Sequence, residues 1–447
     1  MSDPIISVSG LRGIIGESLN PALAINYCAA FVNSLTGPGP IIVSRDGRAS
    51  GQMLAGAICS GIAAAGRDIL FANVAATPTT GVLVRQHKAA GGIQISASHN
   101  PAPYNGIKLF GGDGRVISAG PGEKVLQAYH SGEFSWASHE SIGNVKPLQD
   151  TTSVHLGKVL ATVDREKIAS RKFKVVLDSN RGAGSVLGKR LLESLGCEFQ
   201  ILGEQPDGQF EHTPEPTEEN LQPTVKRALE FQADAVFCQD PDADRLAIID
   251  ESGKYIGEEY TLAITANHAL AQNKGPVVVN CSSSRMTADI AAAHGCPFHI
   301  SAVGEANVTD KMIAENAVYG GEGNGGPIDP RVGYVRDSFV AMAQVLDAMA
   351  ADGKKISQLV ADIPSYEIHK TKIALDRDQV PGLMDALQTH FSEAKANRMD
   401  RLRLEWDDRW LLVRPSNTEP IVRAIAEASS IEQAKQMCAA AVELAKK

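Results

Sequence analysis

Lys174-Val-Val-Leu177, the stretch 185–196 and Phe199-Gln-Ile201 form the segment that decides the fold of this chain. The first and last runs are short and apolar, which is typical of buried strands. The stretch between them is typical of a helix that ends at a glycine, Gly196. A strand, a helix and a second strand form a right-handed unit with parallel strands. The segment therefore predicts an α/β domain.

The same order of elements occurs twice more in the chain. One copy starts at Ile41-Ile-Val-Ser44 and the other at Pro276-Val-Val-Val-Asn280. Each of the three copies also has a later apolar strand that runs into a polar or glycine-rich loop, and these strands are predicted at residues 92–95, 235–238 and 317–319. Ligands bind at the carboxyl ends of strands in open α/β sheets, so we expect the three loops to form one site.

The chain has a different pattern after about residue 366. Short strands are predicted at 372–375, 402–406 and 410–413, and a final helix is predicted to begin at the capping pair of Ser430 and Gln433. We therefore predict three similar α/β domains with mixed sheets, followed by a smaller C-terminal α+β domain, around a central cleft. Their predicted boundaries are residues 1–150, 151–252, 253–366 and 367–447.

Composition narrows the class of protein. The 447 residues carry a formal net charge of −9 with both signs interspersed, and no basic tract indicates a nucleic-acid partner. The seven cysteines form no Cys-x-x-Cys pair, which favours reduced thiols. No apolar stretch has the length of a membrane span or the pattern of a secretion signal. We expect a cytoplasmic enzyme, monomeric or homodimeric, that binds neither nucleic acid nor membrane.

Three aspartates, Asp240, Asp242 and Asp244, follow the predicted strand 235–238 at alternate positions. Alternate side chains of a strand point the same way, so a turn that continues this spacing could direct all three carboxylates to one point, where like charges repel. We therefore expect a cation there. Oxygen ligands without a neighbouring His or Cys favour Mg²⁺, which usually shares its site with a phosphate. The first hypothesis is metal-assisted phosphate chemistry.

Two other interpretations of the acidic segment are open. One is a solvated acidic turn. The other is a calcium loop of the EF-hand type, since Glu251 completes the ligand spacing. Against the calcium loop, its sixth position should be glycine and is Arg245, and the flanking segments have the pattern of strands rather than helices.

A serine loop, Ser96-Ala-Ser98-His99-Asn100-Pro101, follows the strand at 92–95. Taken alone, this sequence is explained at least as well by a turn, because Asn-Pro favours turn initiation. Beside a Mg²⁺ site, however, the hydroxyl of Ser98 could carry a phosphoryl group, and His99 and Lys108 would be available for proton transfer or phosphate contacts. No Gly-x-Ser-x-Gly motif surrounds Ser98, which argues against acyl transfer.

Four ordered motifs give the chain a resemblance to a known family. The serine loop is the first, and the metal loop, Asp240 to Arg245, is the second. The third is Gly321-Glu322-Gly-Asn324-Gly-Gly326, and the fourth is Arg414-Pro-Ser416-Asn417-Thr418-Glu-Pro420. With Arg12, which lies in a Gly-Leu-Arg-Gly segment, they extend over essentially the whole chain. The sequence resembles the α-D-phosphohexomutases, which include phosphoglucomutase, phosphomannomutase and phosphoglucosamine mutase.

The resemblance implies a mechanism and a role for each domain. It implies that Ser98 is held as phosphoserine and binds Mg²⁺ together with the three aspartates, with Arg12 near the reacting phosphate. The phosphoryl group passes to a sugar hydroxyl, and the resulting hexose 1,6-bisphosphate reorients and returns its other phosphate to the serine. In chain order, the domains carry the phosphoserine loop, the metal loop, the sugar loop and the phosphate loop. The residues implied to anchor the non-reacting phosphate are Arg414, Ser416, Asn417, Thr418 and Arg423.

The sugar loop departs from the family's usual Gly-Glu-x-Ser-Gly-His. Glu322 is kept, Asn324 replaces serine, and Gly326 replaces histidine. The segment that begins at Gly304 also lacks the aromatic and basic residues that are common in the family. By resemblance, substrate binding also involves Arg245, Gly304, Glu322 and Asn324.

The divergent sugar loop makes glucosamine the leading sugar, because phosphoglucosamine mutase belongs to the branch that it resembles. Phosphomannomutase/phosphoglucomutase activity is the alternative. Two lesser alternatives are a metal-dependent sugar-phosphate hydrolase and a non-catalytic sugar-phosphate sensor. In each case the partner is a small sugar phosphate, and the expected cofactors are Mg²⁺ and a hexose 1,6-bisphosphate.

Overall fold

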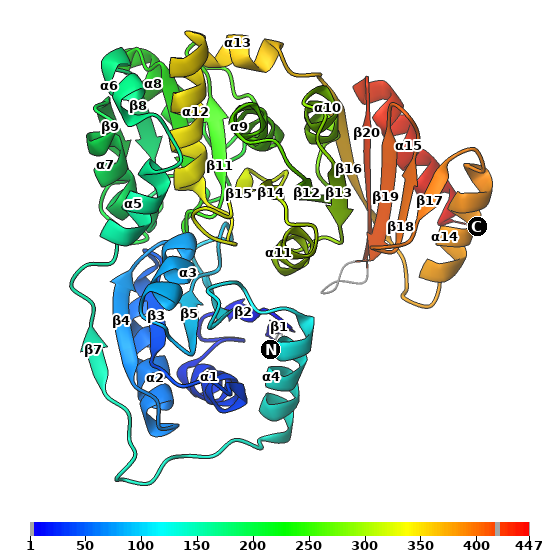
Figure 1. Cartoon of the computed structure of the whole chain (residues 1–447). Helices are drawn as coiled ribbons and strands as arrows, with labels where there is room; N and C mark the ends of the chain where they lie inside the picture. The colour runs from blue at the N-terminus through cyan, green and yellow to red at the C-terminus, as the bar shows by residue number, and fades with distance from the viewer. Residues whose placement is uncertain (1–3, 416–420, 447) are drawn as a thin grey trace.

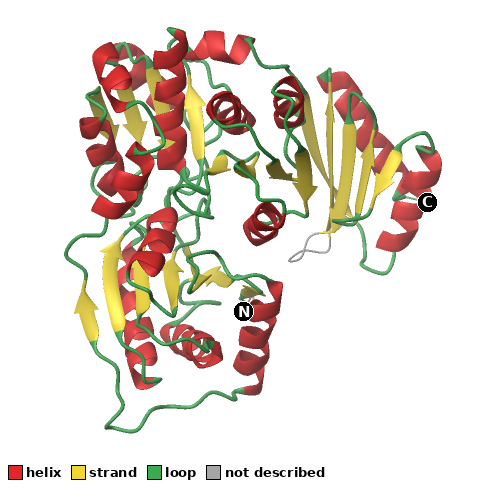
Figure 2. Ribbon diagram, in the orientation of Figure 1, coloured by secondary structure: helices red, strands yellow, loops and turns green. Residues whose placement is uncertain are grey.

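The computed structural model describes residues 4–415 and 421–446 as four consecutive domains, each with its own sheet (Figure 1). Figure 2 shows helices packed against the sheets of the first three domains and a smaller α+β domain at the C-terminal end of the chain. The first three sheets combine parallel and antiparallel strands. The predicted fold class is therefore confirmed. None of the described helices has both the length and the apolar character needed to cross a membrane.

The first domain has a seven-stranded sheet in the order β1-β2-β6-β5-β3-β4-β7. Helices cover both faces, because Ile41 packs in the core beneath α1 and α2 while its neighbour Ile42 packs with residues of α3. The strands are β1 (Ile5–Ser7), β2 (Gly10–Ile14), β3 (Ile41–Arg45), β4 (Ile69–Val74), β5 (Gly91–Ile95), β6 (Tyr104–Gly111) and β7 (Val145–Pro147). The helices are α1 (Pro21–Ser34), α2 (Ala49–Ala64), α3 (Thr77–Gln86) and α4 (Ala119–Ser131).

The second domain has a four-stranded sheet in the order β11-β10-β8-β9. β8 lies parallel to both β9 and β10, and β11 returns antiparallel beside β10. The strands are β8 (Lys174–Asp178), β9 (Glu198–Leu202), β10 (Ala235–Gln239) and β11 (Leu246–Ile249). The helices are α5 (Ser153–Leu160), α6 (Arg165–Arg171), α7 (Gly184–Ser194) and α8 (Gln222–Phe231).

The third domain repeats this arrangement in the order β13-β12-β14-β15. Its β14 begins at Tyr319, two residues after the start of the predicted strand, because the amide of Ala317 still bonds to the carbonyl of Met312 at the end of the preceding helix. The strands are β12 (Val277–Asn280), β13 (Phe298–Ser301), β14 (Tyr319–Glu322) and β15 (Gly326–Ile328). The helices are α9 (Glu258–Gln272), α10 (Met286–Ala293), α11 (Glu305–Ala314), α12 (Ser338–Asp352) and α13 (Ile356–Ala361).

The fourth domain has a five-stranded antiparallel sheet in the order β16-β20-β19-β18-β17. Its last helix begins where the sequence predicted, since the side chain of Ser430 accepts a hydrogen bond from the amide of Gln433 at 3.3 Å. The strands are β16 (Glu367–Ala374), β17 (Lys395–Asn397), β18 (Leu402–Glu405), β19 (Trp410–Pro415) and β20 (Ile421–Ala428). The helices are α14 (Val380–His390) and α15 (Ile431–Leu444).

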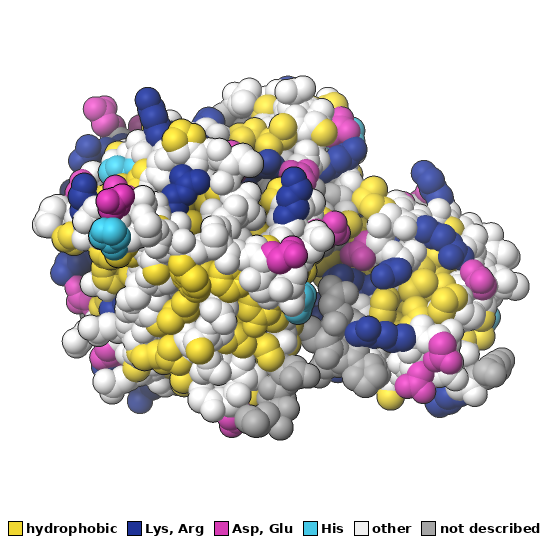
Figure 3. All heavy atoms as spheres, turned by 90° about the horizontal axis from the view of Figure 1, so that it is seen from below, with side chains coloured by type: hydrophobic (Ala, Val, Ile, Leu, Met, Phe, Trp, Pro, Cys, Tyr) yellow, Lys and Arg dark blue, Asp and Glu magenta, His cyan; other side chains and the backbone are white. Residues whose placement is uncertain are grey.

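The domains differ in how their cores connect. One core cluster runs through the second and third domains and includes Leu187, Phe237, Leu262 and Phe339. The first and fourth domains each have a separate main core. Seen from below, the fourth domain forms a lobe of its own beside the first (Figure 3). The second and third domains are therefore joined by buried apolar packing, whereas the other two attach to them through smaller contacts.

Candidate active site

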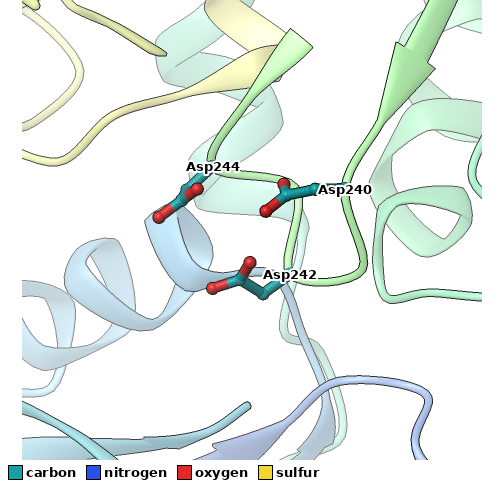
Figure 4. A group of neighbouring side chains, drawn as sticks. All are labelled: Asp240, Asp242 and Asp244. Carbon is teal, nitrogen blue, oxygen red and sulfur yellow. The ribbon is translucent and has the colours of Figure 1, made fainter. Parts of the chain in front are cut away.

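The loop that joins β10 to β11 brings together the three aspartates of the acidic segment (Figure 4). Ala243 has a φ of +55°, in the left-handed region, and the chain turns so that Asp240, Asp242 and Asp244 point toward one another. One carboxylate oxygen of each lies within 4.8 Å of the others, and all three residues are fully buried. The burial excludes a solvated turn, and the flanking strands exclude an EF-hand.

In the part of the chain that the structure describes, two buried oxygens of the cluster have no hydrogen-bond partner, Oδ1 of Asp242 and Oδ1 of Asp244. The other oxygen of each carboxylate is held by donors. Nζ of Lys108 lies 3.1 Å from Oδ2 of Asp242 and 2.9 Å from Oδ2 of Asp244, and Thr77 donates to Oδ2 of Asp242 at 2.5 Å. Buried polar atoms are normally satisfied, and oxygens such as these are the ligands that Mg²⁺ prefers. The residues therefore fit a hard divalent cation.

The three carboxylates are not equivalent electrostatically. Burial, together with the charges of Asp242 and Asp244, raises the pKa of Asp240 well above its usual range. Burial also opposes ionisation of Asp244, but the positive charges of Arg336 and Lys108 outweigh it and lower the pKa of Asp244. A cation at the cluster would favour the ionised form of every ligand, so we expect its binding to release a proton.

Ser98 lies beside this cluster, in the loop between β5 and β6. Its hydroxyl donates to Oδ2 of Asp240 at 2.6 Å, and its backbone amide donates to the side chain of Ser96 at 2.9 Å. Ser98 has a φ of +49°, which is costly for a residue with a side chain, and it is 5% exposed. Strained backbone that persists at a polar site is a feature of functional loops. The serine and metal loops therefore share one site.

Arg48, at the start of α2, holds the backbone of the serine loop through hydrogen bonds. Its guanidinium pairs with Asp46 at 3.1 Å and is 2% exposed. Asp46 also accepts a hydrogen bond from Ser96 at 2.6 Å. This arginine is therefore paired with a buried carboxylate. Arg48 donates at 2.5–3.0 Å to the carbonyl oxygens of Ser98, Asn100, Pro101 and Tyr104.

The three other residues predicted to act in catalysis lie around Ser98. Nδ1 of His99 is 3.4 Å from the serine hydroxyl, and burial lowers the pKa of His99 to about 3, so the ring is neutral at neutral pH. Burial disfavours the charge of Lys108, yet the neighbouring aspartates raise its pKa, so it remains an ammonium. Arg12, on β2, donates to the side chain of Asn100 at 2.9 Å.

The predicted sugar loop lies at the end of β14, and its carboxylate is already bonded within the protein. Oε1 of Glu322 accepts from Asn280 at 2.8 Å and from the amide of Gly304 at 3.2 Å, and Oε2 accepts from Arg336 at 2.8 Å. Oδ1 of Asn324 is buried without a hydrogen-bond partner among residues 4–415 and 421–446. The amide carbonyl of Asn324 is therefore an acceptor that a ligand could use.

Two cations lie close to the acidic and sugar loops. The backbone amide of Arg245 donates to Oδ1 of Asp240 at 3.2 Å, while its side-chain Nε is buried without a hydrogen-bond partner. Arg336 donates to Asp244 as well as to Glu322. Both guanidinium groups therefore offset part of the negative charge of these loops.

The first and fourth domains face each other across a cavity of about 370 Å³. Arg12 and Lys108 line it from the first domain, and Arg414 and Arg423 line it from the fourth. The described lining residues include no carboxylate, so this cavity suits an anion. The remaining predicted anchors, Ser416, Asn417 and Thr418, lie outside the described residues.

Sequence reasoning missed three residues that organise the site: Thr77, Asn280 and Arg336. Asn280 ends a predicted strand, and that position at the carboxyl edge of a sheet was the one signal that could have identified it. Thr77 and Arg336 belong to no recognisable motif. They contact the acidic loop from 165 and 92 residues away in the chain, respectively.

Four family models match the chain in order. They describe phosphoglucomutase/phosphomannomutase α/β/α domains I, II and III and a C-terminal domain. The matched residues are 4–136, 153–253, 258–366 and 378–444.

Individual proteins give the same result. The chain is 35% identical over 436 residues to the phosphoglucomutase/phosphomannomutase of Thermococcus kodakarensis, covering 96% of this chain and 95% of that protein. It is 33% identical over 434 residues to a probable phosphoglucosamine mutase of Methanopyrus kandleri, with 96% and 95% covered. A crystal structure of a phosphoglucomutase/phosphomannomutase family protein from Burkholderia thailandensis matches with a TM-score of 0.86 at 26% identity, covering 99% of this chain and 98% of that one. The chain therefore belongs to the phosphoglucomutase/phosphomannomutase family of α-D-phosphohexomutases.

Proposed function

We propose that this protein interconverts the 1-phosphate and 6-phosphate of a hexose or hexosamine through a phosphoserine at Ser98. The observation that carries the proposal is the position of the Ser98 hydroxyl, 2.6 Å from Asp240 and beside two buried carboxylate oxygens that have no partner. A serine in this place can carry a phosphoryl group whose charge a bound cation offsets.

The proposed reaction has two phosphoryl transfers. In the first, the bond between phosphorus and the Ser98 oxygen breaks while a bond forms to a sugar hydroxyl, whose proton is transferred to the serine oxygen. This gives a hexose 1,6-bisphosphate. The bisphosphate then reorients, and the second transfer runs in reverse from its other phosphate, so the serine is phosphorylated again. The net change is the exchange of a phosphate between two oxygens of one sugar.

Mg²⁺ is the cofactor proposed for this site, bound by Asp240, Asp242, Asp244 and the phosphate of Ser98. When bound, it would neutralise charge on the phosphoryl oxygens during transfer. Lys108 and Arg12 supply further positive charge on the first-domain side of the cleft. His99 is neutral at neutral pH, so its ring can form a hydrogen bond to a hydroxyl or a phosphate oxygen. It is not an imidazolium, so it does not serve as a cationic general acid at that pH.

The non-reacting phosphate is proposed to bind in the cavity between the first and fourth domains. Arg414 and Arg423 line it, and a guanidinium can bind two phosphate oxygens at once. Ser416, Asn417 and Thr418 belong to the same proposed anchor on the basis of the motif. A hydrolase or a sensor would not require a second phosphate site as well as a serine and metal loop, and the mutase accounts for both.

Glucosamine is the proposed sugar, with phosphomannomutase/phosphoglucomutase activity as the alternative. The relatives carry both kinds of name, which supports the reaction class more than the choice of sugar. On this proposal Glu322, Asn324, Gly304 and Arg245 face the substrate. The unpaired carbonyl of Asn324 can accept a hydrogen bond from a 2-ammonium group or from a hydroxyl.

A substrate panel tests the function directly. The purified protein is supplied with Mg²⁺, a catalytic amount of hexose 1,6-bisphosphate and the 1-phosphate of glucosamine, mannose, glucose or N-acetylglucosamine. We expect 6-phosphate to form, fastest with glucosamine, and intact-mass analysis with peptide mapping to find phosphate on Ser98. Release of inorganic phosphate without 6-phosphate would indicate a hydrolase, and binding without turnover would indicate a sensor.

A further inference from the structure

One guanidinium, that of Arg336, joins three loops of the site. Arg336 lies in the connection between β15 and α12 and is 7% exposed. Nη2 donates to Oδ2 of Asp244 at 2.5 Å, Nη1 donates to Oε2 of Glu322 at 2.8 Å, and Nε donates to Oε2 of Glu305 at 3.1 Å. These carboxylates belong to the metal loop, the end of β14 and the start of α11. Each nitrogen of the planar fork therefore has a different carboxylate partner.

The contact with Asp244 selects which of its oxygens remains free. Oδ2 of Asp244 accepts hydrogen bonds from Arg336 and Lys108, while Oδ1 is buried without a hydrogen-bond partner. The carboxylate is thus held by one oxygen and presents the other. Groups that bond to a metal ligand in this way fix its orientation.

The aliphatic stem of Arg336 fills the space beside Gly326. A Cβ added to Gly326 would lie 2.5 Å from Cδ of Arg336, 2.9 Å from its Cγ and 3.0 Å from its Cβ. The stem has little freedom to move away, because the guanidinium at its end is bound to three carboxylates. Glycine at position 326 therefore leaves the space that the side chain of Arg336 occupies.

The backbone next to Arg336 is also fixed. Asp337 accepts hydrogen bonds from the amides of Phe339 and Val340 and so caps α12. Its Oδ2 lies 2.7 Å from Nε2 of the buried His155 on α5. The position from which Arg336 extends is therefore held by both the third and the second domain.

We infer that Arg336 is a positioning residue that fixes the metal-binding carboxylate of Asp244 and the sugar-facing carboxylate of Glu322 in a single arrangement. The role in sugar recognition rests on the proposed function. The role in metal binding rests on the contact with Asp244. The two loops that depart from the common family pattern, at Gly304 and at Gly326, converge on this residue, since its partner Glu305 directly follows Gly304.

Arg336→Lys is the first test, with Arg331→Lys as its matched control. Lysine keeps the charge but has a single nitrogen, which cannot reach all three carboxylates. Arg331 belongs to the same connection and pairs with the buried Asp329 at 2.6 Å, but it contacts neither loop of the site. Loss of a group that orients a metal ligand typically weakens metal binding or activity about 10- to 100-fold. We expect about tenfold weaker Mg²⁺ binding for Arg336→Lys and no change for the control.

The titration uses Mg²⁺ alone, by calorimetry, on proteins whose phosphate content is matched by intact mass. In turnover assays, Arg336→Lys is expected to raise KM for the sugar phosphate and to lower kcat, because both loops lose their common anchor. A purely structural residue would behave differently. If the variant melts at a lower temperature but retains the wild-type Kd for Mg²⁺ and the wild-type kcat/KM, the inference is wrong.

Gly326→Ala is the second test, and it leaves the arginine in place. The backbone of Gly326 is outside the left-handed region, so alanine itself is tolerated, but its methyl group displaces the arginine stem. We expect the same weakening of Mg²⁺ binding as in Arg336→Lys, and no further weakening in the double variant, because both changes act on one group. Gly157→Ala, on exposed α5 backbone with open space around it, is the control and should bind Mg²⁺ normally.

The two proposals fail in different ways. If the wild-type protein converts none of the hexose 1-phosphates, the proposed function is wrong, but the Mg²⁺ titrations need no turnover and still decide the role of Arg336 at the metal loop. If the wild-type protein is a mutase and both variants bind Mg²⁺ as tightly as it does, the function stands and the inference fails.

Discussion

The acidic loop and the side of the cavity lined by the fourth domain are built in different ways. The acidic loop is fully buried, and its carboxylates bond to Thr77 and Lys108 of the first domain and to Arg336 of the third. Arg414 and Arg423 instead line an open cavity, and Arg414 pairs with Asp400 of its own domain at 3.5 Å. The acidic loop is therefore held directly by two other domains, whereas Arg414 pairs within its own domain with Asp400, which in turn accepts a hydrogen bond from the amide of Val303 at 3.1 Å.

The cores show the same difference. The second and third domains share one apolar core, whereas the fourth has its own and meets the third through a small apolar cluster of Cys281, Trp410 and Leu412 and through polar contacts. A small boundary permits relative movement of domains. On the proposed function, the fourth domain would supply a phosphate anchor that can move relative to a preformed serine and metal centre. Such movement would let the cleft close over the proposed bisphosphate while it reorients.

Ser98→Ala is the change with the largest expected effect on the preformed half. Without a hydroxyl no phosphoserine can form, so we expect turnover to fall by more than about a thousandfold. Steady-state assays with Mg²⁺ and bisphosphate measure it, and Ser60→Ala, which removes an exposed serine hydroxyl on α2 of the first domain, is the control. Full turnover by Ser98→Ala would overturn both the mechanism and the comparison.

Asp242→Ala should have the second-largest effect on turnover. It removes one of the two unpaired oxygens offered to the metal, so we expect Mg²⁺-dependent turnover to fall by about 10²-fold or more. Thermal melting with and without Mg²⁺ gives a second measurement, in which the wild type is stabilised by Mg²⁺ and the variant is not. Equal stabilisation of both proteins by Mg²⁺ would show that the metal binds elsewhere.

Arg414→Ala tests the other half of the comparison. An anchor for a phosphate that does not react acts in the ground state and in the transition state alike, so KM should rise while kcat changes little. Hydrogen bonds to charged groups contribute about 1.5–3 kcal/mol, which corresponds to a rise in KM of about 10- to 100-fold. Arg398→Ala, which removes an exposed arginine of the same domain, is the control. A large loss of kcat at unchanged KM would place Arg414 at the reacting centre instead.

The same comparison explains what the sequence could predict. The acidic loop, the serine loop and their strands were predictable because each is a local pattern, a short apolar run followed by a polar turn. The residues that orient those loops were not, since Thr77 and Arg336 contact the aspartates across domain boundaries that no local pattern encodes. The four bonds from Arg48 to the backbone of the serine loop likewise follow from the fold rather than from a local pattern.

Ser98→Gly compared with Ser98→Ala gives a smaller effect, on stability alone. Both variants lack the hydroxyl, but residue 98 has a φ of +49°, which glycine adopts without the steric cost that a Cβ carries. We expect the glycine variant to be more stable by about 1 kcal/mol in denaturant unfolding. Ala97→Gly, at a neighbouring buried residue without a positive φ, should lower stability, and the same sign at both positions would contradict a strained serine.

The last expected effect is a pH dependence of stability at the boundary between the third and fourth domains. Burial, with a contribution from the charge of Glu427, raises the pKa of Glu259 to about 8. A carboxyl whose pKa is raised on folding binds more protons in the folded state, so its contribution to stability is present at low pH and is lost as the pH rises toward and through about 8. Glu259→Gln mimics the protonated form and should flatten the fall in unfolding free energy between the ordinary carboxyl pKa of 4.5 and the raised pKa of about 8. Glu198→Gln, an exposed glutamate on β9, should leave the fall unchanged, and an equally steep fall in Glu259→Gln would assign it to another group.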